Sequence, residues 1–284
     1  ILFHSEQLNF ARGVLGRWMN HFSPRFLFFE GDWQNPQHGV SNAGVMLFAD
    51  LALLISGFIF LARRGKDRSS IFIWLWLIVS PLPAALSRDN IHGVRALNEV
   101  IPLTVILSCG GVFLLEKLKS LKWGKICIII FAAFYLMSFI YFLDQYFVHA
   151  PKHNAKYWQY GHKQMVEAVL PLQNKYKKIV VAQSYAQPYI YFLFYQKYDP
   201  LKYQKDAQVV TTSGGFDVGL VNKLNNLDFE VIDWHIARGR QGILFVGSPE
   251  QIPPGDSNDP NQFKLINEIK YPNGQTAFRL LEVI

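Results

Sequence analysis

The segment 88–99 carries residue types suited to anion chemistry. It holds two guanidinium groups, an imidazole and a carboxylate, at Arg88, Arg95, His92 and Glu99. In a helix these positions follow i, i+4, i+7 and i+11 spacing and share one face. Two guanidiniums and an imidazole together suit a phosphate. The alternative is a snorkelling arginine beside an Arg95–Glu99 ion pair, and Gly93 weakens the helical assumption.

A second set of polar side chains, Glu30, Asp32 and His38, lies in a loop marked by Pro and Gly. Carboxylates and imidazoles bind metals and act in acid–base chemistry. The spacing matches no standard metal motif, so we assign no metal ligand. The three remain a candidate loop site for an acceptor, with a solvated loop as the alternative. The cofactor stays unknown, and a divalent metal is compatible with these residue types.

The composition places both segments in a membrane protein. The chain is 50% hydrophobic and 17% charged, whereas soluble domains carry about 25% charged residues. Four apolar runs cover residues 45–62, 71–86, 100–115 and 126–143. Each is slightly shorter than the roughly 20 residues that span a bilayer, but flanking aromatic and basic residues extend it. Four runs in succession predict a membrane bundle. Asp50, inside the first run, is either functional or a snorkelling or capping carboxylate.

Basic residues cluster in the loops 63–68 and 117–125. The positive-inside rule predicts that both loops are cytoplasmic. An even number of spans then places both ends of the chain on the extracytoplasmic side. The net charge of +7 is thereby explained largely as a topology signal, and we expect no nucleic-acid partner. Two cysteines, Cys109 and Cys127, exclude a disulfide scaffold and a four-cysteine zinc site.

The tail predicts a small α/β domain. Strands are expected at 178–182 and 242–247, with an aromatic helix at 188–198 between them. The segments 263–269 and 276–283 predict a closing hairpin through the turn residues Pro272, Asn273 and Gly274.

The expected fold is therefore a polytopic α-helical membrane bundle of about four helices, followed by a small extracytoplasmic α/β domain. We expect an extracytoplasmic loop with helical segments over 1–43, including a helix at 8–20. Four transmembrane helices follow over 44–146, and the soluble extracytoplasmic domain covers 147–284. The first residues already resemble an extracytoplasmic loop, so we expect the chain to be the C-terminal part of a longer polytopic protein.

Two stretches carry a family resemblance: HFSPRFLFFEGDWQNPQHG at 21–39 and SPLPAALSRDNIHGVRALNEVIPL at 80–103. With the membrane helix between them, they resemble the bacterial C-type glycosyltransferases of the dolichyl-phosphate-mannose–protein mannosyltransferase and aminoarabinose transferase kind. The stretches 157–169 and 188–204 are similar to the outer domain of such proteins. His92 and Arg95 match the family's His-x-x-Arg, and Arg88 is added from its spacing.

The resemblance implies an integral protein of the bacterial plasma membrane. Such enzymes move a sugar from a polyprenyl-phosphate carrier to a lipid, protein or glycan acceptor on the outer face. His92 and Arg95 would contact the donor phosphate, with Arg88 beside them. The family's catalytic carboxylate normally lies in the first outer loop, so we expect it upstream of this chain and expect the fragment alone to be inactive.

Two other readings stay open. The first is a non-enzymatic membrane transport or assembly protein that uses the outer domain to bind a partner. The second keeps the family fold without activity, with the tail as a recognition module. An acidic pair in the first outer loop would favour the enzyme over both.

Overall fold

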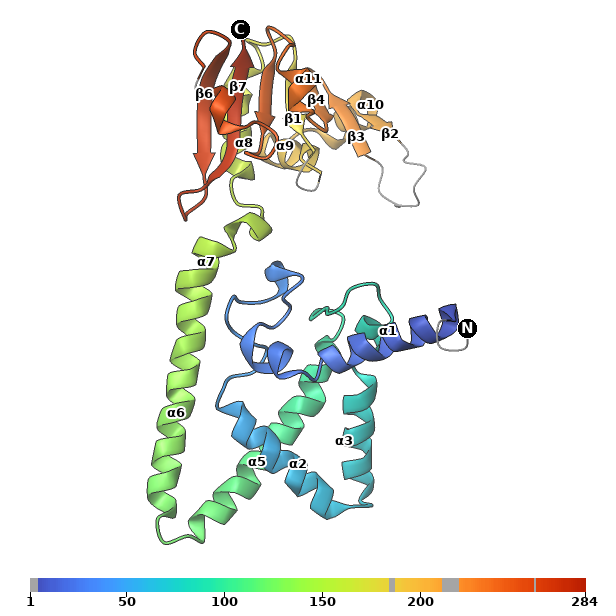
Figure 1. Ribbon diagram of the computed structural model, residues 1–284, viewed down its shortest axis with the longest axis vertical. Coiled ribbons are helices and arrows are strands. Elements are labelled where there is room, and N and C mark those ends of the chain that lie inside the picture. The colour runs from blue at the N-terminus through green and yellow to red at the C-terminus, as the bar shows by residue number, and fades with distance from the viewer. Residues whose placement is uncertain (1–4, 184–186, 211–219, 258) are drawn as a thin grey trace. The chain divides into compact units, whose positions relative to one another are not determined.

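The computed structural model describes residues 5–183, 187–210, 220–257 and 259–284. The chain forms two compact units, Ile1–Asn154 and Ala155–Ile284, which we call unit 1 and unit 2 (Figure 1). Unit 1 is helical, and unit 2 is built on a sheet.

Five helices of at least three turns form the frame of unit 1. They are α1 (Glu6–Asn20), α2 (Asp50–Arg64), α3 (Arg68–Val79), α5 (Val100–Lys119) and α6 (Gly124–Asp144). Side-chain caps start two of them, because Ser5 accepts a hydrogen bond from Leu8 N in α1 and Asp67 accepts one from Ser70 N in α3. The predicted helix at 8–20 is confirmed and begins two residues earlier.

Shorter helical turns connect these helices. They are η2 (Arg25–Phe29), η3 (Pro36–His38), α4 (Leu82–Ala85), η4 (Leu97–Glu99), η5 (Gln145–His149) and α7 (Ala150–His153). The turn η2 is a π-helix whose Phe26, Leu27 and Phe28 side chains are buried in the core of unit 1. This core also holds Leu54 of α2 and Ile106 of α5.

Three helical stretches among the described residues are long and apolar enough to cross a membrane: Arg68–Ala85, Leu97–Lys119 and Gly124–His153. The expected number of about four is not confirmed. The first apolar run forms α2, which begins at Asp50 and has 15 residues. At 1.5 Å per residue it is about 22 Å long, shorter than the roughly 30 Å of bilayer hydrocarbon.

Helix α2 begins late because residues 45–49 are held in a loop. The N–H groups of Val45 and Met46 donate to the carbonyls of Phe26 and Leu27, at 3.3 and 2.8 Å. Asp50 Oδ2 accepts a hydrogen bond from Leu47 N at 2.8 Å, and Oδ1 accepts one from Tyr135 of α6 at 3.0 Å. The Asp50 carboxylate therefore holds the loop that precedes α2 and ties α2 to α6.

Helices α2 and α5 pack against each other at two glycines (Figure 1). A Cβ atom at Gly57 would lie 2.2 Å from the Ile106 carbonyl oxygen, and one at Gly110 would lie 2.0 Å from the Leu53 carbonyl oxygen. Small residues at such contacts let helix backbones approach closely. This crossing supports the loops that meet at the end of unit 1 where α2 and α5 begin.

Unit 2 has a seven-stranded mixed sheet in the order β2-β3-β4-β1-β5-β7-β6. The strands are β1 (Ile179–Ala182), β2 (Gln208–Val210), β3 (Leu220–Leu224), β4 (Leu227–Glu230), β5 (Leu244–Gly247), β6 (Phe263–Lys270) and β7 (Thr276–Val283). Strand β1 is parallel to β4 and β5, and the other pairs are antiparallel. The predicted strands and the closing hairpin are confirmed.

Helical segments accompany both faces of the sheet. They are η6 (Ala155–Trp158), α8 (His162–Val169), η7 (Leu170–Leu172), α9 (Tyr189–Tyr195), α10 (Pro200–Asp206), α11 (Trp234–Ala237) and α12 (Pro254–Ser257). Side chains alternate along β1, as expected for a strand covered on both sides. Ile179 and Val181 pack with Phe192 of α9, whereas Val180 packs with Trp234 of α11.

Candidate functional site

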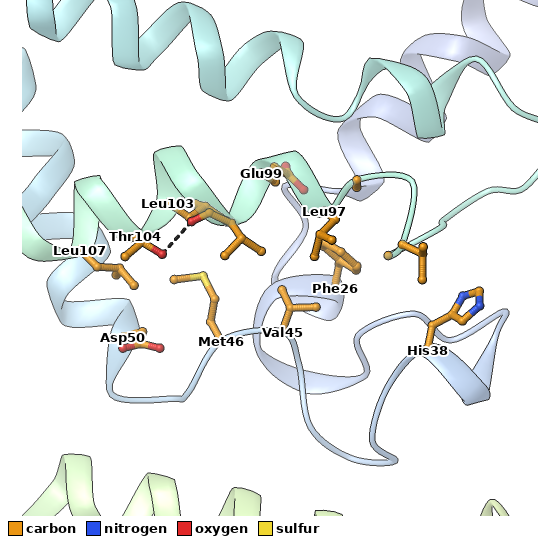
Figure 2. A pocket seen from close by; sticks show the side chains of 14 residues that line it. Phe26, His38, Val45, Met46, Asp50, Leu97, Glu99, Leu103, Thr104 and Leu107 are labelled. Carbon is orange, nitrogen blue, oxygen red and sulfur yellow. Dashed lines mark hydrogen bonds between the residues drawn. The ribbon is translucent and has the colours of Figure 1, made fainter. Parts of the chain in front are cut away.

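Unit 1 contains a cavity of about 410 Å³ between the loop that precedes α2 and the start of α5. Figure 2 shows its lining side chains, which come from η2, from the loop 38–50 and from the segment 93–107. Most of the wall is apolar and includes Phe26, Val45, Met46, Leu103 and Leu107. A cavity of this size and lining accommodates part of an apolar ligand chain.

Four polar residues interrupt the apolar wall: His38, Asp50, Glu99 and Thr104. The Thr104 hydroxyl donates to the Val100 carbonyl at 2.7 Å, the bond dashed in Figure 2. Glu99 is 3% exposed, and its Oε1 atom has no hydrogen-bond partner among the described residues. Because a buried polar atom without a partner is costly, this oxygen is available for a hydrogen bond with a ligand.

Asp32 organises the loops beside the cavity. Its Oδ1 atom accepts hydrogen bonds from the backbone N–H of Asn35 at 3.1 Å and from the Asn35 amide at 3.0 Å. Its Oδ2 atom accepts one from Gly93 N at 2.8 Å. These bonds join the loop that follows η2 to the loop that precedes α5. The Asp32 side chain is 1% exposed, so its charge is held almost entirely by these donors and by His38.

His38 and His92 complete a cluster with Asp32. His38 Nδ1 lies 3.1 Å from Asp32 Oδ2, and the His38 and His92 ring centroids are 4.9 Å apart. One ligand atom from each of the three residues lies within 4.8 Å of the others. His38 also lines the cavity, and so does Gly93, which follows His92 in the chain. The cluster and the cavity therefore share a wall.

His21 lies close enough to Asp32 and His92 for both to act on its titration. The residue is fully buried, and its Nδ1–H donates to the Arg17 carbonyl at 2.9 Å. Burial lowers the pKa of His21, and the Arg17 carbonyl and the charge of Asp32 only partly offset that shift. His21 is thus a neutral neighbour at pH 7 and adds no positive charge to the Asp32 environment.

The expected shared helical face of Arg88, His92, Arg95 and Glu99 is wrong. Residues 88–96 form bends, turns and irregular backbone, and within 88–99 the helical segment is the short turn η4. The Gly93 N–H is committed to Asp32, so a continuous helix is not formed here. Arg95 Nη1 contacts Asp89 Oδ2 at 2.8 Å, so the alternative Arg95–Glu99 ion pair is not formed either.

Of the three residues expected at a donor phosphate, the structure brings His92 and Arg95 together but not Arg88. His92 Nε2 lies 3.9 Å from Asp89 Oδ2, the carboxylate that Arg95 also contacts. Arg88 is exposed and forms no ion pair with a described residue. Arg95 lies between Val94 and Ala96, which both line the cavity. His92 and Arg95 are thus next in the chain to residues that line the cavity, and among the described residues no hydrogen bond or ion pair links Arg88 to either.

The structure likewise does not bring together all three residues of the candidate loop site, Glu30, Asp32 and His38. Glu30 turns to Arg25 at 2.6 Å and is 46% exposed, whereas Asp32 and His38 form the buried contact. Sequence reasoning did not anticipate Asn35 or Gly93 as partners of Asp32. The Asp-x-x-Asn spacing is a turn signal that could have indicated the first of these contacts. No local pattern joins Asp32 to Gly93, because 61 positions separate them.

No family model matches the chain, and no curated protein or solved structure matches it either.

Proposed function

We propose that the chain is part of a membrane glycosyltransferase that uses a polyprenyl-phosphate sugar as donor. The observation that carries the proposal is the mostly apolar cavity of about 410 Å³ with His38 in its wall and Arg95 between two lining residues. An isoprenoid chain suits the apolar wall, and a phosphate suits the imidazoles and the guanidinium at the edge. The three apolar helices are compatible with a lipid-linked substrate.

The chemistry assigns a role to each part. The acceptor hydroxyl or amine attacks the anomeric carbon, the bond from that carbon to the phosphate oxygen breaks, and the lipid phosphate leaves with the electron pair. Arg95 stabilises the charge that develops on the phosphate. A carboxylate base takes the acceptor proton, and we assign this base to none of the residues described above. The acceptor is a lipid, protein or glycan on the outer face.

The Arg95–Asp89 contact sharpens the test, because the phosphate must compete with Asp89 for Arg95. Membranes containing the complete protein would receive a radiolabelled polyprenyl-phosphate sugar pool at matched expression. We expect Arg95→Ala to lower transfer at least about tenfold, and Asp89→Asn to preserve it. Arg68→Ala, at the start of α3, is the matched control and should have no effect.

Transfer that survives Arg95→Ala would remove Arg95 from the donor site while leaving the enzyme. No transfer with any carrier sugar by the wild type would contradict the proposed function itself. A photoreactive polyprenyl phosphate provides a second measurement, since it should label the segment 93–107 in the wild type.

A further inference from the structure

The geometry points to a metal site: Asp32, His38 and His92 bind one divalent transition-metal ion of the zinc type. Asp32 and His38 come from one loop and His92 from a second loop far along the chain, and each offers one ligand atom within 4.8 Å of the others. No local sequence motif predicts the site, because the loop before α5 contributes His92. The sequence-level expectation of no metal ligand considered Asp32 and His38 without this third residue.

The separation of the ligand atoms fits a shared ion. Zinc binds imidazole nitrogen and carboxylate oxygen at about 2.0 to 2.2 Å, which at a tetrahedral angle places two ligands roughly 3.3 to 3.6 Å apart. His38 Nδ1 and Asp32 Oδ2 are 3.1 Å apart. The His92 ring lies beside the His38 ring, with the centroids separated by 4.9 Å and the planes tilted by 40°. The ligand atom of His92 lies within 4.8 Å of those of Asp32 and His38, so the His92 ring has to move closer to them to share the ion.

The hydrogen bonds around Asp32 fix its carboxylate in the way that is typical of a metal ligand. Ligating carboxylates are usually fixed by further hydrogen bonds. Asn35 supplies two such bonds to Oδ1, and Gly93 N supplies one to Oδ2. The Asp32 side chain is 1% exposed, and a buried carboxylate needs a compensating positive charge. Among the described residues its ion-pair contact is His38, and a bound dication would supply a positive charge beside the carboxylate.

The donor set indicates the class of metal. Two imidazoles and one carboxylate favour zinc, cobalt, iron or manganese over calcium and magnesium, which prefer all-oxygen sites. Three protein ligands leave a coordination position open. Because His38 also lines the cavity, the open position is close to the cavity edge. The role of holding a donor phosphate oxygen there rests on the proposed function, whereas metal binding itself does not.

The test uses the full chain, purified in detergent with a histidine-free affinity tag and stripped of metal. His149 and His153 stack near Asp144 and could add a surface site, so His149→Gln and His153→Gln are introduced into every protein compared. Calorimetry with Zn²⁺ and visible absorption with Co²⁺ should show one bound ion per chain. Asp32→Asn, His38→Gln and His92→Gln should each weaken binding at least about tenfold, and the control His235→Gln, in unit 2, should not.

A Gln variant that misfolds would also lose metal binding, so a second test uses a substitution that keeps a metal ligand at position 92. His92→Cys should still bind Co²⁺ and should add a thiolate-to-cobalt absorption band that the parent lacks. Absence of binding in the parent, or equal binding by the parent and the Gln variants, would overturn the site. So would a folded His92→Cys protein that binds Co²⁺ without the new band. None of these measurements uses a sugar donor, so failure of the metal site and failure of the transfer activity are distinguishable.

Discussion

At the scale of single residues, Arg279 of β7 is the buried cation on which the hairpin of unit 2 depends. Its Nε donates to Glu268 at 3.1 Å and its Nη1 donates to the Ile252 carbonyl at 2.7 Å. Removal of the guanidinium leaves the buried Ile252 carbonyl without its charged donor, whereas Glu268, with a side chain 26% exposed, keeps its contacts with Thr276 and Lys270. We expect Arg279→Gln to cost about 1.5 to 3 kcal/mol, the typical contribution of a hydrogen bond to a charged group.

Hydrogen exchange of peptides across β6 and β7 measures this cost. Exchange should be at least about tenfold faster in Arg279→Gln, given 1.4 kcal/mol per factor of ten. Arg240→Gln is the control, since Arg240 pairs with Glu230 at 2.7 Å but both side chains are more than a third exposed. That pair should contribute about 0 to 1 kcal/mol. Equally faster hydrogen exchange in the two variants would contradict the prediction that the Arg279 contacts stabilise the hairpin more than the exposed Arg240–Glu230 pair.

The same scale shows why the candidate site was only partly predictable. Residue types were informative, since His38, His92 and Asp32 were all singled out and all lie at the site. Their arrangement was not, because the helical spacing assumed for 88–99 ignores a hydrogen bond from Gly93 to a residue 61 positions earlier. The burial of Glu99 could not be predicted for the same reason. Tertiary contacts between loops produce no periodic pattern in the sequence.

At the scale of elements, the crossing of α2 and α5 depends on the missing side chains of two glycines. We expect Gly57→Ala and Gly110→Ala each to destabilise unit 1 by about 1 to 3 kcal/mol, because the new methyl group meets a backbone carbonyl rather than a movable side chain. Gly111→Ala is the control, since its Cβ would meet only Leu53 Cδ2, at 4.0 Å. Thermal unfolding in detergent should separate the first two variants from the third.

Elements with strong local patterns were predicted well. The long apolar helices α5 and α6 and the β6–β7 hairpin follow from hydrophobic length and from a Pro-Asn-Gly turn. The start of α2 was wrong by five residues, because Val45 and Met46 are apolar yet bond to the backbone of η2. Hydropathy records that these residues avoid water, but it does not record which backbone groups they bond.

At the scale of the whole molecule, the question is how many times unit 1 crosses the bilayer. Asp32 bonds Gly93, so the loop before α2 and the loop between α3 and α5 lie at the same end of unit 1. The basic residues Arg63 and Arg64 end α2 and precede α3 at its other end. Helix α2 therefore runs between the two ends although its 15 residues are short for a span. A crossing by α2 would require local thinning of the bilayer.

Cysteine labelling in intact cells tests this topology. With Cys109 and Cys127 replaced by Ala, single cysteines are placed at exposed positions through Glu6→Cys, Lys66→Cys and Lys163→Cys. The positive-inside rule puts Lys66 in the cytoplasm, so an impermeant maleimide should label the Glu6 and Lys163 variants and spare the Lys66 variant until the cells are opened. If α2 does not cross, Glu6 and Lys163 lie on opposite sides, and only the Lys163 variant is labelled from outside. Labelling of Lys66→Cys in intact cells would instead show that the orientation of the whole chain is the reverse of the expected one. The three positions thus distinguish the alternatives, because a non-crossing α2 changes only the labelling of the Glu6 variant, whereas inversion changes the labelling of all three.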